Sequence, residues 1–169
     1  CIFINKQVDI YSLAKLQLNN NIMLLYQKGD PCNVERCNDN RAETGAMSEC
    51  ITVLISTKNG KLYGIHCAGG LSEERVDAIV NSFIRTGEQA TGVLAIFGFC
   101  YQNATALPFL GDKFELVRII AARLSTVYAI ASSSNAVIDL VNGSFVPRTE
   151  LKLWTSHNGW TSNSGVIAM

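Results

Sequence analysis

The residues best suited to covalent chemistry are Cys50 and His66, which lie 16 positions apart in the stretch ECITVLISTKNGKLYGIHCAGG. A free thiol has a pKa of about 8.5, and an adjacent imidazole can take its proton and leave a nucleophilic thiolate. If that thiolate attacked a carboxamide, ammonia would leave with a proton from the imidazole, and water would hydrolyse the thioester. Cysteine is also among the most buried residue types, so a packed thiol beside an unrelated histidine is the alternative.

Whether the pair can meet depends on the register of the hairpin that carries it. A two-residue turn at 59–60 would pair Thr52 with Cys67 and place His66 on the face opposite Cys50. A three-residue loop, Lys58-Asn59-Gly60, with Gly60 in the left-handed conformation, would pair Thr52 with His66 instead. The two groups would then share a face as diagonal neighbours, about 7 Å apart at the backbone. Both registers are compatible with the sequence, and the chemistry requires the second.

The remaining sequence predicts the elements that position this hairpin. We expect a helix followed by a strand over 10–26 and a polar surface loop over 27–43. Further helices are expected over 72–87, capped by Ser72, and over 111–125, capped by Asp112. A buried strand is expected over 91–101, and strands over 126–132 and 136–146 with a turn at Asn142-Gly143 precede a turn-rich tail with Trp154, His157 and Trp160. We therefore expect an α/β (α+β) fold, in one domain over 1–169, with a mixed, largely antiparallel sheet or sandwich flanked by helices.

Composition excludes several other classes of function. The formal net charge is zero and the pI is about 6.9, which argues against nucleic-acid binding. No run of 18 apolar residues occurs, so we expect a soluble chain with no membrane partner. The first residue is Cys1 rather than Met, which suggests a processed chain or a piece of a longer one.

The six cysteines are too sparse for a disulfide scaffold, so we expect mostly free thiols in a reducing cytosol. Cys32 and Cys37 could close a small disulfide loop or offer two metal ligands. A second ligand pair at zinc spacing is missing from the sequence, so we expect neither a metal nor a cofactor.

Thr44, followed six positions later by Cys50 and then by His66 at the end of the next strand, resembles the pattern of the cysteine glutamine deamidases. That group joins the bacterial chemoreceptor deamidases (CheD) with toxins such as the cytotoxic necrotizing factors (CNF) and Burkholderia lethal factor. The order of elements over about 44–146 is also similar to that of the chemoreceptor enzymes. Two residues depart from the pattern: Glu49 replaces a small residue, and Ser48 matches the toxin serine where the chemoreceptor form has glycine.

The resemblance implies a CheD/CNF-like fold with Cys50 as nucleophile, His66 as general base and acid, and Thr44 orienting the histidine through its hydroxyl or a neighbouring carbonyl. It implies a protein glutamine deamidase, a monomeric hydrolase acting on a carboxamide of a protein substrate. We expect a bacterial toxin or effector involved in virulence, secreted or delivered into a host cell. The alternatives are a chemoreceptor-type deamidase, a transglutaminase outcome from the same thioester, and an inactive binding module on the same fold, for which Glu49 is the main argument.

Overall fold

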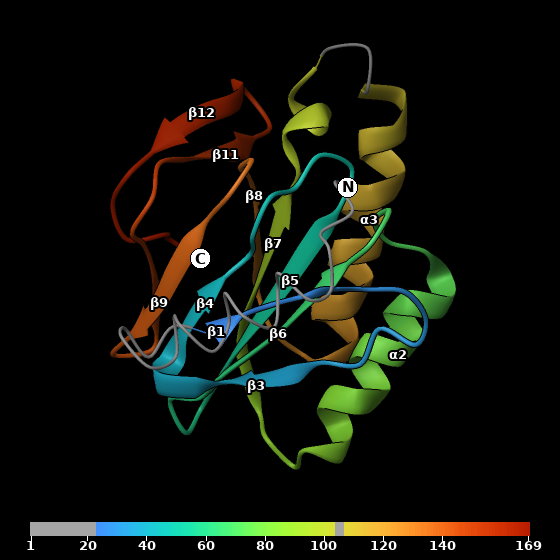
Figure 1. Ribbon diagram of the computed structural model, residues 1–169, viewed down its shortest axis with the longest axis vertical. Helices are drawn as coiled ribbons and strands as arrows, with labels where there is room; N and C mark the ends of the chain where they lie inside the picture. The colour runs from blue at the N-terminus through green and yellow to red at the C-terminus, as the bar shows by residue number, and fades with distance from the viewer. Residues whose placement is uncertain (1–22, 104–106) are drawn as a thin grey trace.

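The computed structural model describes residues 23–103 and 107–169 (Figure 1). Its strands are β1 (Met23–Leu24), β2 (Gln27–Lys28), β3 (Glu35–Cys37), β4 (Arg41–Glu43), β5 (Ile51–Thr57), β6 (Leu62–Cys67), β7 (Ala90–Phe97), β8 (Tyr128–Ser132), β9 (Val137–Val141), β10 (Ser144–Pro147), β11 (Leu151–Thr155) and β12 (Gly159–Asn163). Its helices are α2 (Glu73–Arg85) and α3 (Leu107–Arg123), with short 3-10 helices η1 (Asn38–Asn40) and η2 (Phe99–Gln102). The helix expected to begin near residue 10 lies outside the described residues.

Within the described residues the strands form two sheets. The larger has the order β12-β11-β8-β7-β5-β6-β2, with β3 also pairing with β6, and the smaller has the order β1-β4-β9-β10. Helices α2 and α3 cover one face of the larger sheet, and the smaller sheet lies over its other face (Figure 1). Most strand pairs are antiparallel, and β7–β8, β2–β6 and β1–β4 are parallel. The predicted mixed, largely antiparallel sheet flanked by helices is confirmed.

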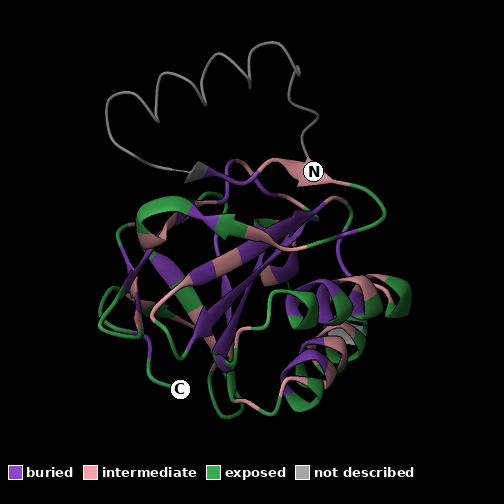
Figure 2. Ribbon diagram, turned by 90° about the horizontal axis from the view of Figure 1, so that it is seen from below, coloured by how far each residue is buried: buried purple, intermediate pink, exposed green. Residues whose placement is uncertain are grey.

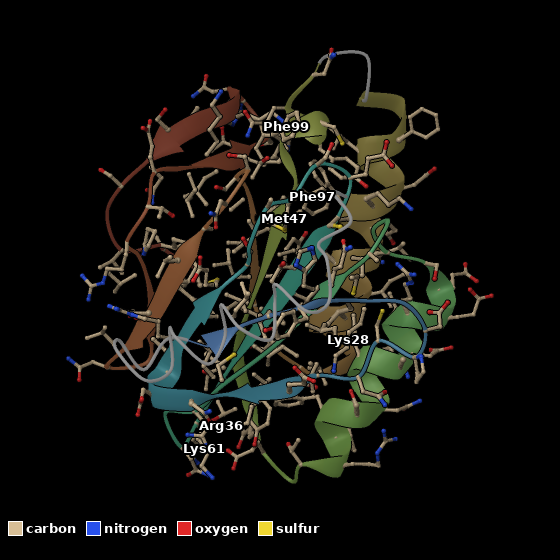
Figure 3. All side chains as sticks on the ribbon, in the orientation of Figure 1. Lys28, Arg36, Met47, Lys61, Phe97 and Phe99 are labelled. Atoms are coloured by element: carbon tan, nitrogen blue, oxygen red, sulfur yellow. The ribbon has the colours of Figure 1, made fainter. Side chains whose placement is uncertain are left out.

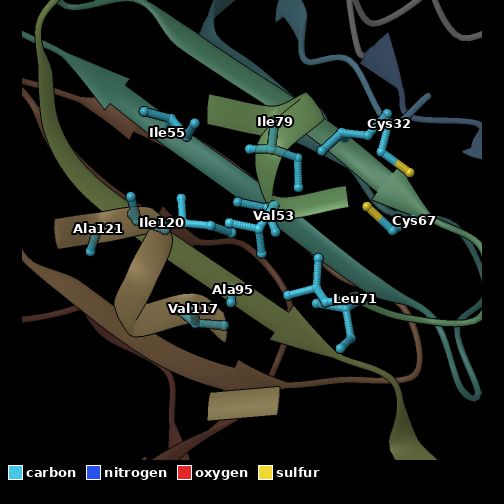
Figure 4. Close-up of a cluster of buried hydrophobic side chains, with 14 of the residues drawn as sticks. Cys32, Val53, Ile55, Cys67, Leu71, Ile79, Ala95, Val117, Ile120 and Ala121 are labelled. Carbon is cyan, nitrogen blue, oxygen red and sulfur yellow. The ribbon is translucent and has the colours of Figure 1, made fainter. Parts of the chain in front are cut away.

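The central strands β5 and β7 are long apolar runs because both of their faces are covered. Figure 2 shows this middle layer as almost continuously buried. Odd-numbered residues of β5, such as Val53, pack toward the helices, as Figure 4 shows. Even-numbered residues, such as Leu54, pack toward the smaller sheet. Any residue that shares the even-numbered face therefore lies between the two sheets.

The helix predictions hold for α2 and fail in part for α3. The Ser72 hydroxyl accepts a hydrogen bond from the Arg75 backbone N–H at 3.3 Å, so the predicted cap is confirmed. Asp112 is not a cap, because α3 begins at Leu107 and already includes this residue. Pro108 stands in the first turn of α3, where its missing N–H is tolerated. The proline, rather than the acidic residue, marks the start of this helix in the sequence.

The prediction of a surface loop over 27–43 was wrong, since the segment contains β2, β3, η1 and β4. These strands are two or three residues long and rich in polar residues, so no alternating pattern identifies them. They form by joining strands distant in sequence: β2 and β3 join β6, and β4 joins β9. Cys37 and Ala42 provide their buried contacts.

The C-terminal third also contains more strand than we expected. The predicted turn at Asn142-Gly143 joins β9 to β10 with φ values of +51° and +80°, as a two-residue hairpin requires. The tail is not a series of turns but the hairpin β11–β12, in which Trp154 pairs with Trp160 at a ring-centroid distance of 5.1 Å. Trp154 also packs on Phe114 of α3 at 5.0 Å, so the hairpin is held to the core by aromatic contacts. Among the described helices, none is long and apolar enough to cross a membrane.

Candidate active site

The β5–β6 hairpin adopts the register that the chemistry requires. Thr52 lies opposite His66 in the antiparallel ladder. The loop closes through hydrogen bonds from the Thr57 N–H to the Lys61 oxygen at 3.0 Å and from the Gly60 N–H to the Thr57 oxygen at 2.9 Å. Gly60 has a φ of +73°, the left-handed conformation that the three-residue loop needs. His66 therefore shares a face with Thr52, and by alternation so does the residue two positions before it, the candidate nucleophile.

Cys50 directly precedes β5, and the turn before it is fixed by the chain at 98–100. Backbone N–H groups of 98–100 donate to the carbonyl oxygens of Cys50, Met47 and Ser48 at 2.9, 3.3 and 3.2 Å. This close approach depends on Gly98, because a β carbon there would lie 2.1 Å from the Ser48 oxygen. Figure 3 labels Met47 at this end of the sheet. A glycine 48 positions away in the sequence thus sets the backbone that presents the cysteine.

His66 is held by backbone groups on the face between the sheets. Its Nδ1 lies 3.2 Å from the carbonyl oxygen of Leu25, and its ring also forms a hydrogen bond with the backbone of Thr44. Burial lowers the pKa of His66 below its ordinary value of 6.5, while the two backbone hydrogen bonds act in the opposite direction. The net direction is downward, which leaves the imidazole neutral at pH 7 and able to accept a proton.

Thr44 contacts the histidine through its backbone, which decides between the two modes considered from the sequence. Its hydroxyl is already occupied: it donates to the Gly45 oxygen at 2.8 Å and accepts the Ala136 N–H at 3.0 Å. The Thr44 N–H also donates to the Ala136 oxygen at 2.9 Å. The threonine side chain therefore anchors the end of β4 to the chain before β9, and this anchor places the backbone group that meets His66.

Gln27 completes the cluster, and sequence reasoning missed it. It lies beside His66 in the parallel β2–β6 pair, and its side-chain Oε1 lies 3.5 Å from the Cys50 Sγ. Gln27 falls in the segment 27–43 that the sequence predicts as a loop, and no local pattern marks the two-residue strand β2. The strand exists only through its pairing with β6, which joins residues far apart in the sequence.

The state of the sulfur is part of the site. Cys50 is disulfide-bonded, whereas Cys32, Cys37, Cys67 and Cys100 are free thiols. The expectation of mostly free thiols thus holds for those four cysteines, whereas Cys50, the expected thiol nucleophile, is oxidised. Cys50 and His66 are also buried, with exposed fractions of 0% and 1%. A reaction at Cys50 therefore requires reduction of the disulfide and movement of the covering chain.

The other candidates lie away from this cluster. Cys32 and Cys37 do not form a disulfide, and they pack into cores on opposite faces of the larger sheet. Cys67 also packs on the helix side, away from the His66 face. His157 is exposed in the β11–β12 turn. Within the described residues, no group of three or more His, Cys, Asp or Glu side chains is arranged to hold a metal ion.

The sequence matches no model of a known protein family, and no curated protein matches it. A sulfur, an imidazole, a carboxamide and backbone carbonyl groups meet between the two sheets at the start of β5.

Proposed function

We propose that the protein is a glutamine deamidase that hydrolyses a side-chain carboxamide of a protein substrate. The observation that carries the proposal is the register of β5 and β6, which places Cys50 and His66 on one face. The backbone hydrogen bond between His66 and Thr44 supports it, because a general base must be held in one orientation. The same three residues form the pattern that resembles the cysteine glutamine deamidases.

The chemistry follows from the protonation states. Once Cys50 is reduced, the neutral His66 takes its proton, and the thiolate attacks the carboxamide carbon of the substrate. The backbone N–H of Cys50 is the candidate donor to the oxyanion that forms. The C–N bond breaks, ammonia leaves with the proton from His66, and water hydrolyses the thioester. Glutamine and water thus become glutamate and ammonia.

The disulfide at Cys50 places a condition on where the reaction runs. A sulfur held in a disulfide is not a nucleophile, so the proposed enzyme is inactive until a thiol reductant acts on it. Such a condition suits a toxin or effector that leaves an oxidising environment and acts in the reducing cytosol of another cell. Delivery into a host cell therefore forms part of the proposal, together with a substrate in that cytosol.

A second candidate function is a binding module that has lost the chemistry. The burial of both Cys50 and His66 favours it, because a closed site cannot admit a substrate side chain. The two candidates differ in the behaviour of the reduced protein. The module keeps the site closed, whereas the enzyme opens it by displacing the two-residue edge strand β2.

The decisive experiment measures deamidation directly. Native extracts of host and bacterial cells are incubated with the reduced protein, with Cys50→Ser and with the matched control Cys100→Ser, and glutamines are compared by mass spectrometry. We expect a gain of about one dalton at specific glutamines with wild type and with Cys100→Ser, but not with Cys50→Ser. Adding a primary amine tests for transglutamination, which would replace ammonia by the amine at the same glutamine.

Alkylation of the reduced protein separates the enzyme from the module. Iodoacetamide at pH 7 should label Cys50 at least about tenfold faster than Cys37, and His66→Gln should abolish the difference. Burial raises the pKa of Cys37 to about 12, which makes it a suitable slow reference. Equal and slow labelling of Cys50 and Cys37, with no change at any glutamine, would support the binding module and exclude the deamidase.

A further inference from the structure

A second pair of sulfur atoms meets on the opposite face of the larger sheet. Cys67, at the end of β6, lies beside Lys28 in the parallel β2–β6 register. Cys32 folds back toward the same point, with its Sγ 3.4 Å from the Gly29 oxygen and 3.8 Å from the Lys28 oxygen. The Cys32 and Cys67 side chains form a hydrogen bond, and Figure 4 shows their sulfur atoms facing each other. Both residues carry free thiols.

The surroundings make the two thiols unequal. The hydrogen bond with Cys67 is the largest cause that lowers the pKa of Cys32, and the Arg75 guanidinium acts in the same direction. The same hydrogen bond, together with burial, raises the pKa of Cys67. Arg75 is held in place because it donates to the backbone oxygens of Ala68 and Gly70 and to the carboxylate of Asp30. Cys32 is thus the thiol suited to attack an oxidant, and Cys67 the one suited to close on it.

The position of Cys32 in the chain favours access by a small oxidant. Cys32 is itself 0% exposed, but it belongs to the connection between β2 and β3, where Asp30, Pro31 and Asn33 are exposed. Cys37, by contrast, lies at the end of β3 in the core between the two sheets. A local opening of a surface connection requires less free energy than opening that core, so peroxide should reach Cys32 before Cys37.

We propose that Cys32 and Cys67 form an oxidation site at which hydrogen peroxide closes a reversible disulfide. The Cys32 thiolate attacks one oxygen of the peroxide, the O–O bond breaks, and the departing hydroxide takes a proton to become water. The Cys67 sulfur then attacks the sulfenic acid sulfur, the S–O bond breaks, and a second water leaves. The two thiols together lose two protons and two electrons, and one hydrogen peroxide takes them up to become two waters.

The cross-link has a consequence for the strand that covers the candidate active site. It ties the connection after β2 to the end of β6, one residue beyond His66 and close to Gln27. Oxidation therefore holds β2 in place and opposes its displacement. The chemistry of this site does not depend on the proposed deamidase, since both thiols lie on the helix side of the sheet.

The test uses the full chain treated with equimolar hydrogen peroxide, followed by unfolding, alkylation and tryptic digestion without reduction. Trypsin releases Cys32 in the peptide 29–36 and Cys67 in the peptide 62–75, each with a single cysteine. We expect these two peptides joined, about two daltons below the sum of their masses, and separated again by dithiothreitol. The oxidised protein should also melt about 5 °C higher than the reduced one.

Matched variants make the outcome decisive. Cys37→Ser should still form the cross-link, whereas Cys67→Ser should leave a sulfenic acid at Cys32 that dimedone traps. The proposal is overturned if both cysteines remain fully alkylated after peroxide treatment, or if Cys37 oxidises as fast as Cys32. It is also overturned if dimedone labels Cys32 to the same extent in the wild type and in Cys67→Ser, because Cys67 would then not resolve the intermediate.

Discussion

Thr52 lies directly opposite His66, and this pairing turns the imidazole toward the space between the two sheets. The Thr52 hydroxyl donates a hydrogen bond to the Met47 Sδ at 3.1 Å, and Met47 lies in the segment that leads to Cys50. The pair therefore joins the strand that carries the histidine to the turn that presents the cysteine. A shift by one residue would send His66 to the helix side and separate the proposed catalytic groups.

The first prediction concerns the three-residue loop that closes the β5–β6 hairpin in this register. Gly60→Ala should lower the free energy of unfolding by about 1 kcal/mol, because a β carbon is strained at a φ of +73°. No atom lies within 4 Å of the added carbon, so the cost comes from the backbone alone. Urea denaturation of Gly60→Ala and wild type measures this loss in the free energy of unfolding. Gly29→Ala is the control, also in open space but without a positive φ, and an equal loss there would contradict the explanation.

The second prediction concerns the close approach at Gly98. Gly98→Ala places a carbon 2.1 Å from the Ser48 carbonyl oxygen, so the backbone before Cys50 must move. We expect a loss of about 3 kcal/mol in the free energy of unfolding. Chemical denaturation gives the value, with Gly111→Ala as the control at an open position within α3. If Gly98→Ala were as stable as wild type, the turn would not depend on this contact.

The third prediction separates the side chain of Thr44 from its backbone. Thr44→Val leaves the Ala136 N–H without its hydroxyl acceptor, so stability should fall by about 1–2 kcal/mol. Deamidation by the molecules that remain folded should change by less than about threefold, because the backbone contact with His66 persists. Rates normalised to the folded fraction test this. A hundredfold loss of rate would instead assign the orienting role to the hydroxyl.

The fourth prediction concerns the ion cluster that holds the smaller sheet. Arg41 and Arg148 both donate to the Asp139 carboxylate, and the Arg41 hydrogen bond is the largest cause that lowers the pKa of Asp139. The carboxylate therefore stabilises the fold above the unfolded-state pKa of about 3.9 and loses this effect as the pH falls through the folded-state value. Asp139→Asn should cost about 2 kcal/mol at pH 7, and the difference from wild type should vanish in acid.

Unfolding curves from pH 7 to pH 3 measure that convergence. Asp77→Asn is the matched control, since Asp77 pairs with Arg123 at an exposed position where its side chain is 64% accessible. An exposed pair of this kind contributes little, so we expect a change below about 0.5 kcal/mol. A loss at Asp139 no larger than at Asp77 would show that burial of the cluster is unimportant.

The fifth prediction concerns His66 and acid. Burial lowers its pKa, so as the pH falls below about 6.5 the unfolded state binds the proton first and the folded state loses stability. His66→Gln should remove this slope between pH 6.5 and the folded-state pKa, and it should slow deamidation at least about 100-fold. His157→Gln, at an exposed turn, serves as the control. An unchanged slope in His66→Gln would place the titrating group elsewhere.

The sequence determined the features that depend on neighbours along the chain. The Ser72 cap and the left-handed turn at Asn142-Gly143 follow from local chemistry and appear where predicted. The apolar strand predicted over 91–101 appears as β7 but ends at Phe97, and residues 99–102 form η2 instead. The hairpin itself was also predictable. Of the candidate site, Cys50, His66 and Thr44 could be named in advance, and the resemblance suggested their roles.

Only the tertiary structure chose between the two registers of that hairpin. Both loops suit the local sequence, and long-range contacts select one: Ile96 of β7 lies opposite Thr52, and the Asn40 side chain donates to the Gly60 oxygen at 2.7 Å. The short strands β2 and β4 could not be predicted for the same reason. Their residues carry no pattern of their own, and they become strands because β6 and β9 offer backbone groups that a buried chain must satisfy.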